Sequence, residues 1–95
     1  MKTLERAVEI IVEDIRTDVE GYYQDWEIEN WQEYLDATGR DSADFKEDVY
    51  YMLSHSEING TGFMRFTDDC EIIEDDGTVV SYRQLMNQVR KAMGW

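Results

Sequence analysis

Few residues of this chain could take part in catalysis. The sequence holds one histidine, His55, in a Ser-rich stretch, and one cysteine, Cys70. A nucleophilic enzyme needs a base beside its nucleophile, and a single loop histidine is far more often a surface residue than a catalytic base. Cys70 is expected to open a strand as a small core residue, and the lack of a CxxC motif or histidine cluster argues against zinc. We therefore expect a protein that is not an enzyme and that uses no metal and no cofactor.

Two acidic runs, residues 68–71 (DDCE) and 74–77 (EDDG), have the side chains that a divalent cation would need. Ca²⁺ and Mg²⁺ are bound by carboxylate oxygens, but the EF-hand spacing D-x-[DN]-x-[DN]-G does not occur here. A metal-dependent nuclease is also disfavoured, because so anionic a surface would repel a phosphate substrate. We interpret these runs as solvated turns or as part of an acidic binding face, and cation binding by one of them stays an open alternative.

The most unusual stretch is 20–36, EGYYQDWEIENWQEYLD, in which aromatic residues are interleaved with acids. Its five aromatic residues are Tyr22, Tyr23, Trp26, Trp31 and Tyr34. Its six acids are Glu20, Asp25, Glu27, Glu29, Glu33 and Asp36, and no Lys or Arg occurs between Arg16 and Arg40. Large rings are usually buried in part, so we expect two or three of the five to pack inward and the others to stand partly exposed among the acids.

The net charge of −13, from 22 acidic and 9 basic residues, is the strongest global signal. It exceeds the magnitude of about 2–8 that suits a soluble small domain, and such an excess destabilises the fold through self-repulsion. Residues 80–95 carry three basic residues and no acid, so residues 1–79 carry six basic and 22 acidic residues, a charge of −16. This field would repel nucleic acid and anionic membranes, and it would attract a basic surface such as the nucleic-acid cleft of another protein.

Length and patterning predict a single α+β domain spanning residues 1–95. Apolar spacing and capping signals predict helices over 3–23, 31–38, 43–54 and, after Ser81, to the C-terminus. Three short strands, forming an antiparallel meander, are predicted over 63–67, 70–74 and 78–80. The expected order is three N-terminal helices, a three-stranded meander and a C-terminal helix (α-α-α-β-β-β-α).

Several local signals define these elements more closely. Asn30 and Glu33 have the spacing of a capping box, Gly39 stands where a left-handed residue ends a helix, and Asp76-Gly77 predicts a type I′ hairpin turn. The predicted apolar face of the first helix consists of Leu4, Val8, Ile11, Ile15, Val19 and Tyr22.

In its size, acidity, aromatic content and single cysteine, the chain resembles the small anti-CRISPR and anti-restriction DNA-mimic proteins of phages and mobile elements. The resemblance is one of class. It covers the size and charge of the whole chain. No sequence motif matches, so the resemblance assigns no functional residues. It implies a basic target, which is either the PAM-reading or guide/DNA channel of a CRISPR effector nuclease or the DNA groove of a restriction enzyme.

The leading hypothesis is therefore a non-enzymatic inhibitor that occupies a nucleic-acid-binding surface by acidic DNA mimicry. The alternative is a protein-interaction or assembly module of a phage or mobile element, whose acidity serves solubility. Neither hypothesis involves direct binding to nucleic acid or to a membrane, and both admit a monomer or a dimer. The predicted contact residues are Glu20, Tyr23, Asp25, Trp26, Glu27, Glu29, Glu33 and Asp36, and secondarily Asp68, Asp69, Asp75 and Asp76.

The sequence predicts a location in the cytoplasm of the bacterial host cell. The N-terminal residues MKTLERAVEII are amphipathic with early acids, unlike a signal peptide. No run approaches the roughly 18 apolar residues that a membrane-spanning helix needs. A lone cysteine also fits a reducing compartment.

Overall fold

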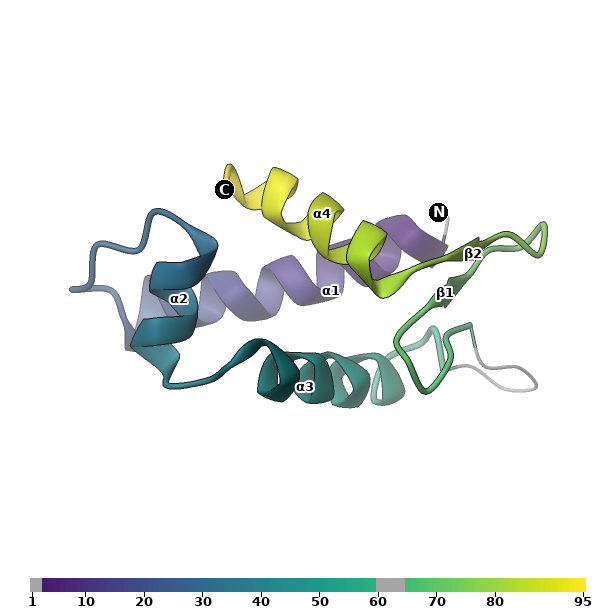
Figure 1. Ribbon diagram of the computed structural model, residues 1–95, viewed down its shortest axis with the longest axis horizontal. Helices are drawn as coiled ribbons and strands as arrows, with labels where there is room; N and C mark the ends of the chain where they lie inside the picture. Colours follow the sequence, from purple (N-terminus) through teal and green to yellow (C-terminus); the bar gives the residue numbers. More distant parts are fainter. Residues whose placement is uncertain (1–2, 60–64) are drawn as a thin grey trace.

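The computed structural model describes residues 3–59 and 65–95, which form four α-helices and a two-stranded antiparallel sheet (Figure 1). The molecule is elongated, with extents of 42 × 23 × 21 Å. The loop before α2 lies at one end of the long axis, and the hairpin between β1 and β2 lies at the other (Figure 1). In chain order the elements are α1 (Thr3–Thr17), the π-helix η1 (Asp18–Tyr22), α2 (Trp31–Thr38), α3 (Ser42–Ser54), β1 (Ile72–Ile73), β2 (Val79–Val80) and α4 (Tyr82–Met93).

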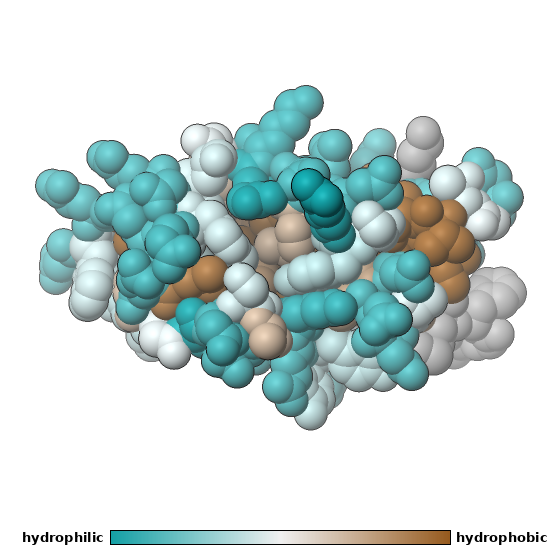
Figure 2. Space-filling model, viewed as in Figure 1, coloured by the Kyte–Doolittle hydropathy of each residue, from teal (hydrophilic) through white to brown (hydrophobic). Residues whose placement is uncertain are grey.

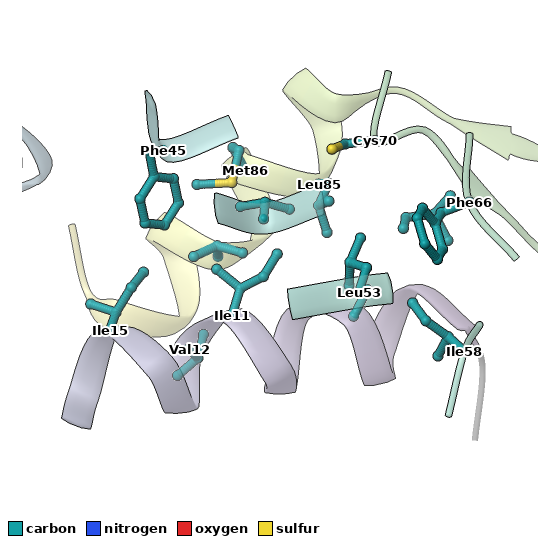
Figure 3. Packing of buried hydrophobic residues seen from close by; sticks show 14 of the residues in the cluster. Ile11, Val12, Ile15, Phe45, Leu53, Ile58, Phe66, Cys70, Leu85 and Met86 are labelled. Atoms are coloured by element: carbon teal, nitrogen blue, oxygen red, sulfur yellow. The ribbon is translucent and has the colours of Figure 1, made fainter. Parts of the chain in front are cut away.

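The core forms around α1, against which α3, α4 and β1 pack. Ala7, Ile11 and Ile15 recur every four residues along α1 and are fully buried, which is the spacing expected of an amphipathic helix. Phe45 of α3 and Leu85 of α4 join them in one cluster (Figure 3). Burial of each large side chain contributes about 1.5–3 kcal/mol, so this cluster fixes α3 and α4 on α1.

The first helix ends in a π-helical turn instead of continuing as an α-helix to residue 23. The N–H of Tyr23 donates to the carbonyl of Asp18, five residues earlier, at 2.8 Å. A turn closed by an i→i+5 bond contains an extra residue, so the residues that follow are rotated away from the buried face. Val19 still packs on the core, but Tyr22 is 84% exposed. The predicted place of Tyr22 in the apolar face is therefore wrong.

Local capping explains why α2 and α4 begin where the sequence predicted. The side chain of Asn30 accepts a hydrogen bond from the N–H of Glu33 at 2.9 Å, Gly39 is left-handed with φ 69°, and Ser81 caps α4 in a complete capping box. The box predicted at Asn30 is incomplete, because the Glu33 carboxylate accepts from the N–H of Glu29, at 3.1 Å.

The predicted α+β fold with a three-stranded meander is wrong. Within residues 3–59 and 65–95, the sheet has two strands of two residues each, with Ile72 opposite Val80. Of the first predicted strand, residues 63–64 lie outside the described residues, and Phe66 forms only an isolated bridge with Ile72. The strands are short because turns occupy the residues on both sides of β1. The molecule is therefore mainly helical.

The two turns that limit β1 have the same construction. In the first, the N–H of Cys70 donates to Thr67 O at 2.9 Å, and in the second, the N–H of Gly77 donates to Glu74 O at 2.9 Å. Each ends in a left-handed residue, Cys70 with φ 59° and Gly77 with φ 88°, as in three-residue hairpin loops. The predicted type I′ turn is wrong, because that turn needs a positive φ at Asp76 as well, and Asp76 has none.

The left-handed conformation of Cys70 gives a prediction about stability. Both Cys70→Ala and Cys70→Gly remove the buried thiol, but only glycine adopts a positive φ without strain. We expect Cys70→Gly to have the higher free energy of unfolding, by about 0.5–1 kcal/mol, in urea denaturation. At the exposed strand residue Val79 the order should be reversed, with alanine above glycine. A Cys70→Gly variant less stable than Cys70→Ala would contradict the role of backbone strain here.

Candidate partner-binding surface

Two aromatic rings of stretch 20–36 are exposed at one end of the molecule. Tyr22, at the end of the π-helix, is 84% exposed, and Trp26 in the following loop is 57% exposed. Tyr23 is half-buried, and its ring packs edge-on against Trp26, with 5.9 Å between the ring centroids. Residues 23–30, the segment between η1 and α2, form the loop at one end of the long axis (Figure 1). Sequence reasoning missed Tyr22 as a candidate contact residue because it assumed an uninterrupted α-helix.

The other two rings of the stretch anchor α2 to the core. Tyr34 is fully buried, and Trp31 is half-buried against Phe45, with 4.7 Å between ring centroids. The prediction that two or three of the five rings pack inward is confirmed. The loop between Tyr22 and α2 is thus held at both of its ends, by the π-helix and by α2.

The acids of stretch 20–36 are exposed like the two rings. All six are exposed, and none of them forms an ion pair with a basic residue in the described ranges. Figure 2 shows hydrophilic side chains covering most of the viewed face, including the end where residues 23–36 lie. We call this set the acidic–aromatic surface, and its members are Glu20, Tyr22, Tyr23, Asp25, Trp26, Glu27, Glu29, Glu33 and Asp36.

The secondary predicted contacts do not join this surface. Asp75 and Asp76 lie in the hairpin turn at the opposite end of the long axis (Figure 1). Asp75 forms an ion pair with Arg65, and the Asp76 carboxylate accepts from the N–H of Thr78 at 2.9 Å. Asp68 and Asp69 are exposed in the turn before β1. The predicted set of twelve residues therefore forms two separate acidic regions rather than one face.

Arg40 connects the helices that carry the acidic–aromatic surface to the rest of the fold. Its guanidinium donates to the Tyr34 hydroxyl at 2.7 Å and pairs with Asp18 at 3.3 Å and with Asp48 at 2.5 Å. The Tyr34 hydroxyl in turn donates to Asp18 at 2.5 Å. Burial and this bond to Asp18 raise the pKa of Tyr34, so its phenol stays protonated as a donor. One side chain thus links η1, α2 and α3, and sequence reasoning missed it because its partners are remote in the chain.

A pocket lies directly beside this network. It is lined by Asp14, Asp18, Tyr23, Arg40, Asp48 and Tyr51, with Thr38, Met52 and His55. Asp14 and His55 both line this pocket. Among the described residues, neither forms a hydrogen bond with a nucleophilic side chain, and the His55 ring contacts the carbonyl of Tyr51 instead. Across residues 3–59 and 65–95, no three His, Cys, Asp or Glu side chains are grouped so that they could hold a metal ion.

Comparison with protein-family models, curated proteins and solved structures finds no match to this chain. None of the helices in the described part of the chain combines the length and the hydrophobicity needed to cross a bilayer.

Proposed function

We propose that this protein is a non-enzymatic inhibitor of a bacterial defence nuclease, a CRISPR effector or a restriction enzyme, and that it acts in the cytoplasm of the host cell. It binds the basic nucleic-acid-binding surface of that enzyme through acidic DNA mimicry. The observation that carries the proposal is the acidic–aromatic surface, in which six exposed carboxylates without ion-pair partners among the described residues share the stretch 20–36 with the exposed rings of Tyr22 and Trp26.

The spacing of the carboxylates supports charge mimicry. Duplex DNA presents one negative charge per ~1.7 Å of its axis. Glu33 and Asp36 are three residues apart on α2, about 4.5 Å along the helix axis, and the loop acids add further charges at the same end. The helix and the loop together therefore approach the charge density to which a phosphate-binding surface is adapted.

The exposed rings supply packing contacts, which carboxylates alone do not. Aromatic residues and arginines dominate the energetics of protein interfaces, and a basic cleft is rich in arginine. Trp26 and Tyr22 are exposed in the same stretch as the acids, so they can pack on the aliphatic and planar parts of arginine side chains. Charge would then set the association rate, while the rings would slow dissociation.

The test is competition and salt dependence with a purified defence nuclease retained from a bacterial lysate. We expect the protein to displace duplex DNA from the enzyme and to lose at least about tenfold in affinity between 50 and 200 mM salt. Such a loss follows from screening of exposed charges. A complex that barely responds to salt and leaves DNA bound would contradict mimicry, and it would favour the alternative of an assembly module that binds through apolar contacts.

A further inference from the structure

The pocket beside Arg40 extends the acidic–aromatic surface onto α3. It measures about 550 Å³. Tyr23, a member of the surface, lines one part of it, and Tyr51 of α3, which is 55% exposed, lines another. Three carboxylates and one guanidinium, those of Asp14, Asp18, Asp48 and Arg40, give the pocket a charge of −2. A partner that covers the acidic–aromatic surface would therefore meet an anionic cavity flanked by rings.

Asp14 differs from the other two carboxylates of the pocket. Asp18 and Asp48 pair with Arg40, whereas the carboxylate of Asp14 forms no hydrogen bond and no ion pair with any described residue. Burial and the neighbouring charge of Asp18 raise the pKa of Asp14, and Arg40 offsets this effect only in part. An additional cation in the pocket would stabilise the ionised form of Asp14.

We infer that this pocket receives an arginine side chain of the partner, with Asp14 as its carboxylate and Tyr23 and Tyr51 as its flanking rings. The inference rests on the proposed function, because a phosphate-binding surface is the kind of partner that presents arginines at close spacing. It adds a shape-specific contact to a surface that otherwise acts through charge.

The architecture of the pocket favours guanidinium over ammonium. The guanidinium carbon of Arg40 already lies over the rings of Tyr34 and Phe45, at 5.4 and 5.2 Å from their centroids, while its nitrogens bind carboxylates. Arginine stacks on aromatic faces and binds carboxylates in a fixed planar fork, which lysine does not. Tyr51 and Asp14 offer the same two kinds of partner to a second guanidinium.

The experiment is an NMR titration of the full chain with N-acetyl-arginine amide and, in parallel, with N-acetyl-lysine amide. We expect amide shifts at Asp14, Asp18 and Tyr51, with arginine bound several-fold more tightly than lysine. Asp14→Asn should weaken arginine binding at least about tenfold, because a charge-assisted pair is lost. Glu13→Gln is the matched control, since it removes one charge from the adjacent exposed residue of α1, and it should change the affinity less than about twofold.

The melting temperature of Asp14→Asn distinguishes a binding role of Asp14 from a structural role. The pKa of Asp14 is raised in the folded state, so ionised Asp14 destabilises the fold at pH 7. This effect is absent below a pH of about 4, the pKa of an aspartate in the unfolded chain, because Asp14 is then protonated in both states. Asp14→Asn should therefore melt at or above the wild-type temperature at pH 7, and the difference should vanish below about pH 4. A lower melting temperature at pH 7, equal binding of the two amides, or unchanged arginine binding by Asp14→Asn would each overturn the inference.

Failure of this inference is distinguishable from failure of the proposed function. If Asp14→Asn inhibits the nuclease as wild type does, the pocket is not a contact and the acidic–aromatic surface still accounts for inhibition. If arginine binds in the pocket as described but no nuclease is displaced from DNA, the proposed function fails while the arginine site stands.

Discussion

The triple variant Glu29→Gln, Glu33→Gln and Asp36→Asn is expected to bind its nuclease target about 100-fold more weakly at low salt while staying folded. Steering by complementary charge raises association rates by factors of this size, and the variant removes half of the six acids of the surface. The measurement is the association rate and the inhibition constant at two salt concentrations. The variant should also show a shallower dependence on salt than the wild type.

The fold should tolerate these three changes because each amide keeps the oxygen that the structure uses. Glu33 accepts from the N–H of Glu29 and from the Asn30 side chain, at 3.1 and 2.9 Å, and Asp36 accepts from the Gln32 side chain at 2.9 Å. The matched control is the triple variant Glu5→Gln, Glu13→Gln and Glu47→Gln, which makes the same change in net charge at exposed positions outside the surface. Equal loss of affinity in both triple variants would contradict a defined binding surface and leave only a global charge effect.

Arg40→Ala is expected to lower the free energy of unfolding by about 2–3 kcal/mol. Removing one partner of a buried ion pair costs about 3–5 kcal/mol, because the other charges stay behind uncompensated. The side chain of Arg40 is 22% exposed and that of Asp48 is 43% exposed, which places the effect below that range. Without Arg40, three carboxylates face one another in the pocket, and the cation over Tyr34 and Phe45 is lost.

Urea denaturation at pH 7 measures this change in the free energy of unfolding, and two further variants serve as controls. Arg16→Ala removes the same side chain from an exposed position of α1 and should change stability by no more than about 0.5 kcal/mol. Arg40→Lys keeps the charge but not the planar fork, so it should recover only part of the loss. If Arg40→Ala and Arg16→Ala are equally stable, the network is not what holds η1 and α2 to α3.

Helices α2, α3 and α4 could be predicted closely because their ends depend on neighbours in the chain, whereas the end of α1 could not. Asn30 and Gly39 bound α2, and Ser81 with Gln84 begins α4, through bonds that span three or four residues. Asp41 caps α3, and its side chain accepts from the N–H of Asp44 three residues on. Local bonds of this kind are readable from residue types and spacing.

The strands could not be predicted in the same way. The acidic run 68–71 was compatible with a turn, but the left-handed conformation at Cys70 is typical of glycine or asparagine. The sequence therefore did not indicate that the turn includes Cys70, where the second strand was expected to begin. The twin turns then shorten β1 to two residues. A period-2 pattern records which side chains face the core, but it does not determine how many residues pair.

By itself, the sequence determined the charge excess, the boundaries of α2 and α3, the start of α4 and the unusual mixture of acids and rings in stretch 20–36, because these depend on composition and on near neighbours. Only the tertiary structure decided which rings are exposed, since a single π-helical turn rotates Tyr22 outward. It also placed the two acidic regions at opposite ends of the molecule and brought Asp14, Asp18, Arg40 and Asp48 together. Those outcomes depend on how α1, α2 and α3 pack, and packing joins residues that no local pattern relates.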